Sequence, residues 1–309
     1  MKAKRTLFLF CAIVFLFVER SDAGAQDRAL DPDQASPIAI DAPYGYAVDE
    51  IRYLSETEYY DPTIHVTIET DRYLETDIWI AKIQIAHPSQ LRTAFATRYG
   101  NQSGAPVAIL SKRNNAVVAM NGDYHSYENT GIVLRQGHLY RNRPTGKEDV
   151  LIIDDAGDFH AVMSANKDSF TAAYEALGGA WDEGGSILNA LTFGPFLVMD
   201  GVHAHDTYPR NNLFGKRPAQ RTAIAQTGPL SYLLVTAGGP ESTNHSSVGL
   251  TIPQLADYMV GIGCDIAYNL DGGSTATLVF RHTKLNNPVN AKRSVPDILF
   301  FASAFAGMK

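Results

Sequence analysis

The residues with the clearest chemical potential follow an apolar strand near the C-terminus, in the order Asn269-Leu270-Asp271-Gly272-Gly273-Ser274-Thr275. Because strand side chains alternate between two faces, Asn269 and Asp271 are expected to project to the same side. The glycines let main-chain N–H groups approach an anion, and Ser274 and Thr275 add hydroxyl donors. The segment predicts a phosphate or sugar site, and an ordinary Asp-Gly turn explains it equally well when it is considered alone.

A second polar cluster ends another apolar strand, in the order Asn121-Gly122-Asp123-Tyr124-His125. Asn-Gly-Asp is a common turn sequence, which is the better explanation of this segment alone. Two such strand ends on one rim would bring Asp123 and Asp271 together. Two carboxyl groups in different environments can divide a proton-donor role and an anion-stabilising role. Asp123 and Asp271 are therefore the predicted catalytic pair, and Asn121, Gly122 and Tyr124 are predicted substrate contacts.

Two further residues complete the predicted binding site. Arg221 begins the apolar run 222–225, and a guanidinium at a strand edge could hold a phosphate through two hydrogen bonds. Taken alone, Arg221 is better explained as an exposed structural arginine. Gly194 either allows a ligand to approach the backbone closely or marks a bend in a sheet.

Metal and nucleotide chemistry have weaker support. His203 and His205 lie beside Asp206 and could bind zinc, but the residues that follow have the composition of a loop. The chain has no Gly-x-Ser-x-Gly elbow, Walker loop or Cys-x-x-Cys pair, so it does not resemble a serine hydrolase or a nucleotide motor. No metal and no cofactor are predicted.

The elements that position these residues are mostly strands. Regular alternation over residues 64–68 and 78–85 predicts two strands joined by a turn, and the spacing over residues 131–140 predicts a tight hairpin. Other apolar runs of strand length cover residues 117–120, 150–153, 191–199, 222–225 and 232–236.

Two helices are predicted between the strands. One covers residues 168–177 and ends at a Gly-Gly pair, and the other follows the capping residue Thr251, with Pro253 in its first turn. The fold class is therefore α+β, with a mixed, largely antiparallel sheet core, flanking helices and a single catalytic domain over residues 64–309.

The first residues are typical of a secretory signal. Three basic residues precede the apolar run 6–18, which is shorter than the roughly 20 residues of a membrane-spanning helix, and small residues at 23–25 suit a signal peptidase. Residues 1–25 are predicted to be a signal peptide and residues 26–63 a leader or linker. We expect an exported bacterial protein, periplasmic or extracellular, with no transmembrane segment after cleavage.

Charge and cysteine content narrow the class of protein further. The 309 residues include 26 Lys and Arg against 33 Asp and Glu, and this acidic balance disfavours binding to nucleic acid. Cys11 lies in the predicted signal peptide, which leaves Cys264 with no partner for an internal disulfide. The apolar surroundings of Cys264 predict a small buried side chain with no catalytic role.

The order of the motifs resembles the phosphodiester glycosidase family over residues 64–304. The segments that carry the resemblance are residues 121–124, 131–140, 193–195, 221–224, 249–251 and 269–273. It implies a hydrolase, α-N-acetylglucosaminidase-like, that cleaves a sugar from a sugar-1-phosphodiester and leaves a phosphomonoester. Relatives associated with exopolysaccharide imply an envelope polysaccharide as substrate.

The resemblance also implies roles for the site residues. One carboxylate of the pair would stabilise or capture the anomeric carbon and the other would orient water. Arg221 and the amides of Gly272 and Gly273 would hold phosphate, while Asn121, Asn269 and Thr275 would bind hydroxyl groups.

Two alternatives remain open at this point. Ser274 stands where the family commonly has a third glycine, and residues 235–239 lack the common Asp-Gly-Arg, which favours a polysaccharide-binding or assembly protein without turnover. A metal-dependent phosphodiesterase that uses Asp123, Asp271 and His125 is the second alternative.

Overall fold

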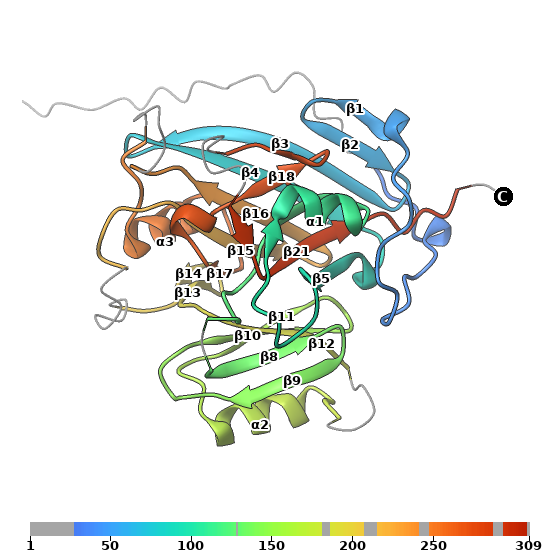
Figure 1. The fold of residues 1–309 in the computed structure, drawn as a ribbon. Coiled ribbons are helices and arrows are strands. Elements are labelled where there is room, and N and C mark those ends of the chain that lie inside the picture. The colour runs from blue at the N-terminus through green and yellow to red at the C-terminus, as the bar shows by residue number, and fades with distance from the viewer. Residues whose placement is uncertain are drawn as a thin grey trace, which may run out of the picture.

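The computed structural model describes residues 28–127, 129–180, 186–206, 215–240, 247–286 and 293–307. Within them, antiparallel strands form three main sheets, and each sheet has one α-helix on its outer face (Figure 1). The predicted α+β fold with a largely antiparallel core is confirmed. The predicted signal peptide lies outside the described residues. None of the described helices is long and apolar enough to cross a membrane.

The first sheet has nine strands. In spatial order they are β1 (Tyr53–Ser55), β2 (Glu58–Asp61), β3 (Ile64–Tyr73), β4 (Thr76–Ile85), β16 (Ser231–Ala237), β15 (Arg221–Gly228), β17 (Ile266–Leu270), β13 (Phe196–Met199) and β14 (Val202–His203). The predicted β3–β4 hairpin is confirmed. Residues 53–61 belong to the predicted leader, but they form β1 and β2, which extend this sheet beyond β3.

The second and third sheets have five strands each. The second comprises β19 (Thr283–Lys284), β18 (Leu278–Phe280), β7 (Ala116–Asn121), β21 (Asp297–Ala302) and β5 (Leu91–Phe95). The third comprises β11 (Phe159–Val162), β10 (Val150–Asp154), β12 (Ile187–Thr192), β8 (Gly131–Arg135) and β9 (His138–Arg143). A two-stranded sheet pairs β20 (Ser294–Val295) with β6 (Ala105–Pro106). The predicted β8–β9 hairpin is confirmed.

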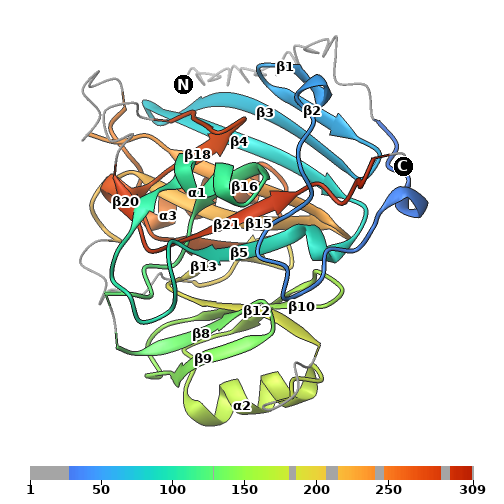
Figure 2. The same ribbon diagram turned by 45° about the vertical axis from the view of Figure 1, so that its right-hand side comes forward.

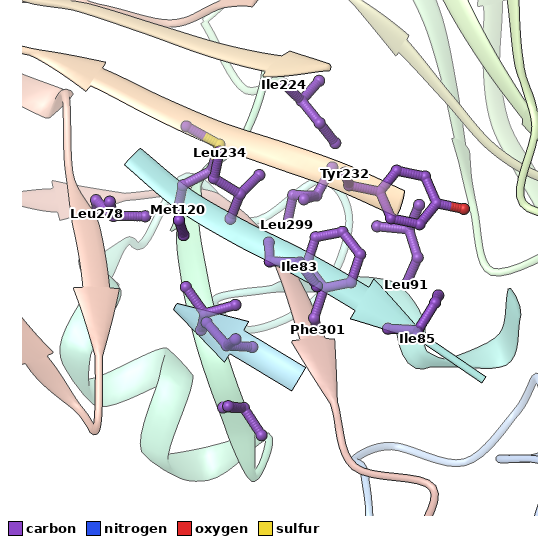
Figure 3. Close-up of a cluster of buried hydrophobic side chains, with 14 of the residues drawn as sticks. Ile83, Ile85, Leu91, Met120, Ile224, Tyr232, Leu234, Leu278, Leu299 and Phe301 are labelled. Atoms are coloured by element: carbon purple, nitrogen blue, oxygen red, sulfur yellow. The ribbon is translucent and has the colours of Figure 1, made fainter. Parts of the chain in front are cut away.

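The inner faces of the three sheets share one hydrophobic core. Figure 3 shows Ile83 and Leu234 of the first sheet near Met120, Leu299 and Phe301 of the second. Leu151 and Leu191 of the third sheet belong to the same cluster. All the residues named here are at least 97% buried, so the sheets form one folding unit.

The outer faces are covered by α1 (Val107–Arg113) on the second sheet, α2 (Lys167–Ala176) on the third and α3 (Ile252–Gly261) on the first. Figure 2 shows α2 at the bottom of the view, below β8 and β9, and α1 near the middle of the molecule, beside β21. The prediction that Thr251 caps α3 is confirmed: its side chain accepts a hydrogen bond from the Gln254 N–H, and the Gln254 side chain bonds back to the Thr251 N–H. Cys264 follows α3, and burial raises the pKa of its thiol to about 12, consistent with an inert buried side chain.

The prediction of one strand over residues 191–199 is wrong. β12 ends at Thr192 and β13 begins at Phe196, and the two strands belong to different sheets. Gly194 has a φ of 74°, and Pro195, which follows a cis peptide bond, has no N–H to donate to a ladder. These two residues break the strand in spite of its apolar sequence.

Three neighbouring strands of the second sheet begin or end at the same level, which we call the site end of this sheet. β7 ends there with Asn121, β21 begins there with Asp297, and β5 ends there with Phe95, as the register between these strands requires. Four short 3-10 helices complete the described structure: η1 (Pro32–Gln34), η2 (Glu50–Arg52), η3 (Pro88–Gln90) and η4 (Gly273–Thr275). Helix η4 lies next to Asn121, since the residues on either side of it, Asp271 and Thr277, both form hydrogen bonds with the Asn121 side chain.

Candidate active site

The two polar strand ends that carry the predicted carboxylates are in direct contact. The Asn121 side-chain amide donates to the Asp271 carbonyl over 2.7 Å, and the Asp271 N–H donates to the Gly122 carbonyl over 3.4 Å. The Asn121 side-chain oxygen also accepts from the Thr277 N–H over 3.0 Å. The side chain of Asn121 therefore joins segments about 150 residues apart, rather than projecting into a ligand site.

Asp271 is partly exposed and has an environment that favours its neutral form. Its carboxyl group accepts a hydrogen bond of 2.6 Å from the Thr275 hydroxyl and one from the Gly272 N–H. Desolvation, followed by the negative charges of Asp297 and Asp123, raises the pKa of Asp271 to about 7. Such a group changes its charge near neutral pH, which suits a catalytic acid or base.

A buried ionic cluster lies behind Asp271. One Arg135 nitrogen lies 2.7 Å from an Asp123 oxygen and 3.0 Å from an Asp297 oxygen, and the His125 Nδ1 lies 3.4 Å from Asp297. The Asp123, Arg135, Asp297 and His125 side chains are 0%, 3%, 1% and 4% exposed. We call these four residues the buried cluster. It holds two carboxylates beside a cation that cannot be deprotonated in proteins.

The pKa values inside the buried cluster reflect this pairing. Burial alone would lower the pKa of Arg135, but the charges of Asp123 and Asp297 raise it. Burial alone would raise the pKa of Asp297, but His125 and Arg135 lower it. Asp297 is therefore held ionised close to Asp271, which helps to keep the Asp271 pKa high.

Asp123 has no surface available to a substrate in this structure. One of its oxygens accepts from Arg135 and the other from the Thr192 N–H over 2.9 Å. Gly122, next to it, packs against Asp297 so closely that a Cβ at this position would overlap with the carboxylate. Of the predicted catalytic pair, Asp271 is the carboxyl group that a substrate can reach.

Two of the predicted substrate contacts are buried against each other. The Asn269 side-chain amide donates to the Gly194 carbonyl over 2.7 Å, and the Gly194 N–H donates to the Asn269 carbonyl over 3.2 Å. Asn269 is only 1% exposed. These hydrogen bonds join β17 to the turn before β13, two residues before Asp271.

The predicted phosphate ligands also bond within the chain. Arg221 donates to the carbonyls of Leu250 and Arg217, each over 2.9 Å, and burial lowers the pKa of its guanidinium to about 10. The Gly273 N–H donates to the Gln220 carbonyl over 2.9 Å. The Gly272 N–H bonds to Asp271, so both amides are already bonded within the chain in this structure, and their phosphate role stays a prediction.

The three remaining predicted residues, Ser274, Thr275 and Tyr124, differ in their exposure. Ser274 is partly exposed, and its hydroxyl has no hydrogen bond within the described residues. Thr275 is buried and bonded to Asp271. Tyr124 adopts a φ of 66° and stacks on Tyr127 with ring centroids 4.1 Å apart. Ser274 and Tyr124 are the predicted binding residues best placed to meet a substrate.

The buried cluster also contains a set of possible metal ligands. Ligand atoms of Asp123, His125 and Asp297 lie within 4.8 Å of one another. Arg135, however, already supplies a positive charge at hydrogen-bond distance from both carboxylates, so the arrangement fits a metal poorly. His203 and His205 pair with different residues, Asp257 and Asp149, over 3.0 and 3.3 Å.

Arg135 and Asp297 are the site residues that sequence reasoning missed. Each is a charged residue at the end of a run of buried aliphatic residues, 132–134 and 298–299. A charge in such a position is rarely buried without a partner. That combination is the signal that could have found them.

Comparison with known proteins gives related folds at low identity. A zebrafish N-acetylglucosamine-1-phosphodiester alpha-N-acetylglucosaminidase catalytic domain, auto-inhibited by its pro-peptide, matches with a TM-score of 0.59 and 15% identity, over 90% of this chain and 96% of that domain. A hypothetical protein from Synechocystis matches with a TM-score of 0.55 and 14% identity, over 80% of this chain and 64% of that protein. This chain thus spans less than two thirds of the Synechocystis protein.

At these identities, the structural matches show a shared fold. No curated protein matches the sequence. The model of the phosphodiester glycosidase family matches residues 114–302, which is more than half of the chain and includes the buried cluster and Asp271. The chain therefore belongs to the phosphodiester glycosidase family.

Proposed function

We propose that this chain hydrolyses glycosyl phosphodiesters, releasing a free sugar and leaving a phosphomonoester, with Asp271 as the catalytic carboxyl group. One observation carries this assignment: a partly exposed carboxyl group with a pKa of about 7 lies where the two family segments meet, backed by buried charges. Family membership supports the reaction class.

The chemistry of the substrate fits a single reachable carboxylate. A phosphodiester leaves as a stable phosphate anion, so breaking the bond to the sugar needs little help from an acid. The transition state has oxocarbenium character and chiefly needs a negative charge near the anomeric carbon. Ionised Asp271 would supply that charge or activate the attacking water, while Asp123 and Asp297 would act through their charges and never touch the substrate.

Activity should depend on pH through Asp271. Since the ionised form acts and its pKa is about 7, kcat/KM should rise about tenfold per pH unit well below pH 7 and level off above it. The measurement is kcat/KM on a glycosyl phosphodiester between pH 5 and 9. A fall in kcat/KM through pH 7 would instead identify Asp271 as a proton donor.

We further propose an exported protein whose substrate is an envelope polysaccharide or exopolysaccharide. The signal-like residues 1–25 support export. The zebrafish protein is named for N-acetylglucosamine, which makes this sugar the first to test. Purified protein should release reducing sugar from N-acetylglucosamine 1-(methyl phosphate) or from phosphodiester-containing envelope polysaccharides. Binding of these compounds without release would support the non-catalytic alternative.

Chelation should separate a glycosidase from a metal-dependent phosphodiesterase. Arg135 occupies the cation position between Asp123 and Asp297, so activity should stay within about twofold after dialysis against EDTA, whereas metal-activated water requires its ion. The assay compares dialysed enzyme with and without added divalent metal. Loss of activity that zinc or manganese restores would favour the phosphodiesterase.

A further inference from the structure

Several aromatic rings lie beside the buried cluster, where β5 ends next to the start of β21. Phe95 lies 5.0 Å from His125, 5.1 Å from Tyr140 and 5.9 Å from Tyr99, between ring centroids. Tyr99 lies 4.9 Å from Tyr140 and is nearly parallel to His125, at 23°. We call Phe95, Tyr99 and Tyr140 the aromatic platform.

The aromatic platform remains partly open to solvent. Tyr140 is 37% exposed, and Phe95 and Tyr99 are half-buried. The hydroxyls of Tyr99 and Tyr140 make no hydrogen bond within the described residues, and the His138 and Tyr140 ring centroids are 4.4 Å apart. The rings thus combine an apolar surface with free polar groups at its rim.

The aromatic platform is continuous with the candidate active site. Phe95 is paired with Asp297 in the register of β5 and β21, and Ile298 is paired with Asn121 on β7. Since neighbouring strands lie about 4.8 Å apart, the platform is on the order of 10 Å from the contact between Asn121 and Asp271. His125 links the buried cluster to the aromatic platform, because its ring lies next to Asp297 and also next to Phe95. β5 itself lies at the border of the second and third sheets (Figure 1 and Figure 2).

We propose that the aromatic platform is a saccharide subsite that holds a pyranose ring of the substrate beyond the scissile phosphodiester. A pyranose has an apolar face of C–H groups that packs on an aromatic ring and hydroxyls that match the tyrosine and histidine groups at the rim. Tyrosine suits such a position because its body is apolar and its end is polar. The proposal deepens the proposed function and rests on it for the position of the scissile bond. It assigns to this chain a preference for oligosaccharide or polysaccharide phosphodiesters over a single sugar phosphodiester.

Binding to an array of neutral and acidic glycans tests the platform without requiring turnover. The wild-type protein should bind a subset of glycans, and Tyr140→Ala or Tyr99→Ala should bind them at least about tenfold more weakly. Tyr140→Phe keeps the ring and should stay within about threefold. Tyr44→Ala removes a tyrosine that is 54% exposed outside the platform and should bind like the wild type. Thermal melting of each variant establishes that it is folded.

Kinetics then separate the platform from the catalytic assignment. For a glycan phosphodiester, Tyr140→Ala should raise KM about tenfold with little change in kcat, and for N-acetylglucosamine 1-(methyl phosphate) it should change neither. The proposal is overturned if the wild type binds no glycan, or if Tyr140→Ala and Tyr99→Ala bind like the wild type. Platform-dependent binding without any hydrolysis would support the subsite and refute the proposed function instead.

Discussion

Replacing Asp271 with Asn should lower kcat/KM by about 1,000-fold and should also make the folded protein more stable at pH 8. The loss of activity follows because Asn cannot carry the charge that the oxocarbenium-like transition state requires. The fold should persist, since the Asn side-chain oxygen can still accept the hydrogen bonds from Thr275 and Gly272. Activity on a glycosyl phosphodiester and urea unfolding are the two measurements.

The gain in stability follows from the raised pKa. Between the usual carboxyl pKa of 3.8 and the folded value of about 7, folded Asp271 keeps a proton that the unfolded chain has lost. The free energy of unfolding therefore falls as pH rises through this interval, by roughly 2–4 kcal/mol from this group. Asp271→Asn lacks that penalty, so its advantage should be present at pH 8 and absent at pH 3.5.

Asp155→Asn is the matched control, because Asp155 is an exposed carboxyl group far from the proposed chemistry in the β10–β11 turn. It should change neither activity nor stability appreciably. Full activity of Asp271→Asn would refute the catalytic assignment. A variant that is less stable than the wild type at pH 8 would refute the desolvated environment of this carboxyl group.

Arg135→Met should destabilise the protein by about 3–5 kcal/mol, since it leaves the Asp123 and Asp297 carboxylates buried without their cation. Activity should fall as well, because the buried cluster supports the segment that contacts Asp271. Urea unfolding at pH 7 measures the effect. Lys82→Met is the control: Lys82 pairs with Glu69 at the surface, with side chains 53% and 47% exposed, and its loss should be below about 1 kcal/mol.

A second substitution tests whether charge is the cause of this instability. Adding Asp297→Asn to Arg135→Met removes one of the two uncompensated carboxylates and should restore part of the lost stability. The account of the buried cluster fails if Arg135→Met costs no more than Lys82→Met. It also fails if the double variant is less stable than Arg135→Met alone.

Much of the fold could be predicted because its signals are local. The alternation in β3 and β4 and the capping pattern at Thr251 each fix an element through neighbouring residues. Helix α1 was missed because its seven residues, 107–113, include an apolar run that suits a strand equally well. The break at Gly194 and Pro195 was missed because the apolar pattern runs through it, although both residues disfavour a continuous ladder.

The site was predictable in its position but not in its internal contacts. The approach of Asp271 to residues 121–122 followed from two similar strand ends. A polar side chain at a strand end can contact a ligand or satisfy the backbone, and Asn121 and Asn269 do the second. The pairing of Arg135 with Asp297, 162 residues away, depends on the arrangement of two sheets, which local sequence does not specify.

Hydrolysis in water labelled with oxygen-18 tests the central claim most directly, because it shows which bond of the phosphodiester breaks. Purified protein would be incubated with N-acetylglucosamine 1-(methyl phosphate) and with a phosphodiester-linked envelope polysaccharide, and both products would be analysed by mass spectrometry. The account predicts the label in the released sugar, at the anomeric hydroxyl, and none in the phosphomonoester. Label in the phosphate would show cleavage of the phosphorus–oxygen bond and would contradict a glycosidase that acts through Asp271.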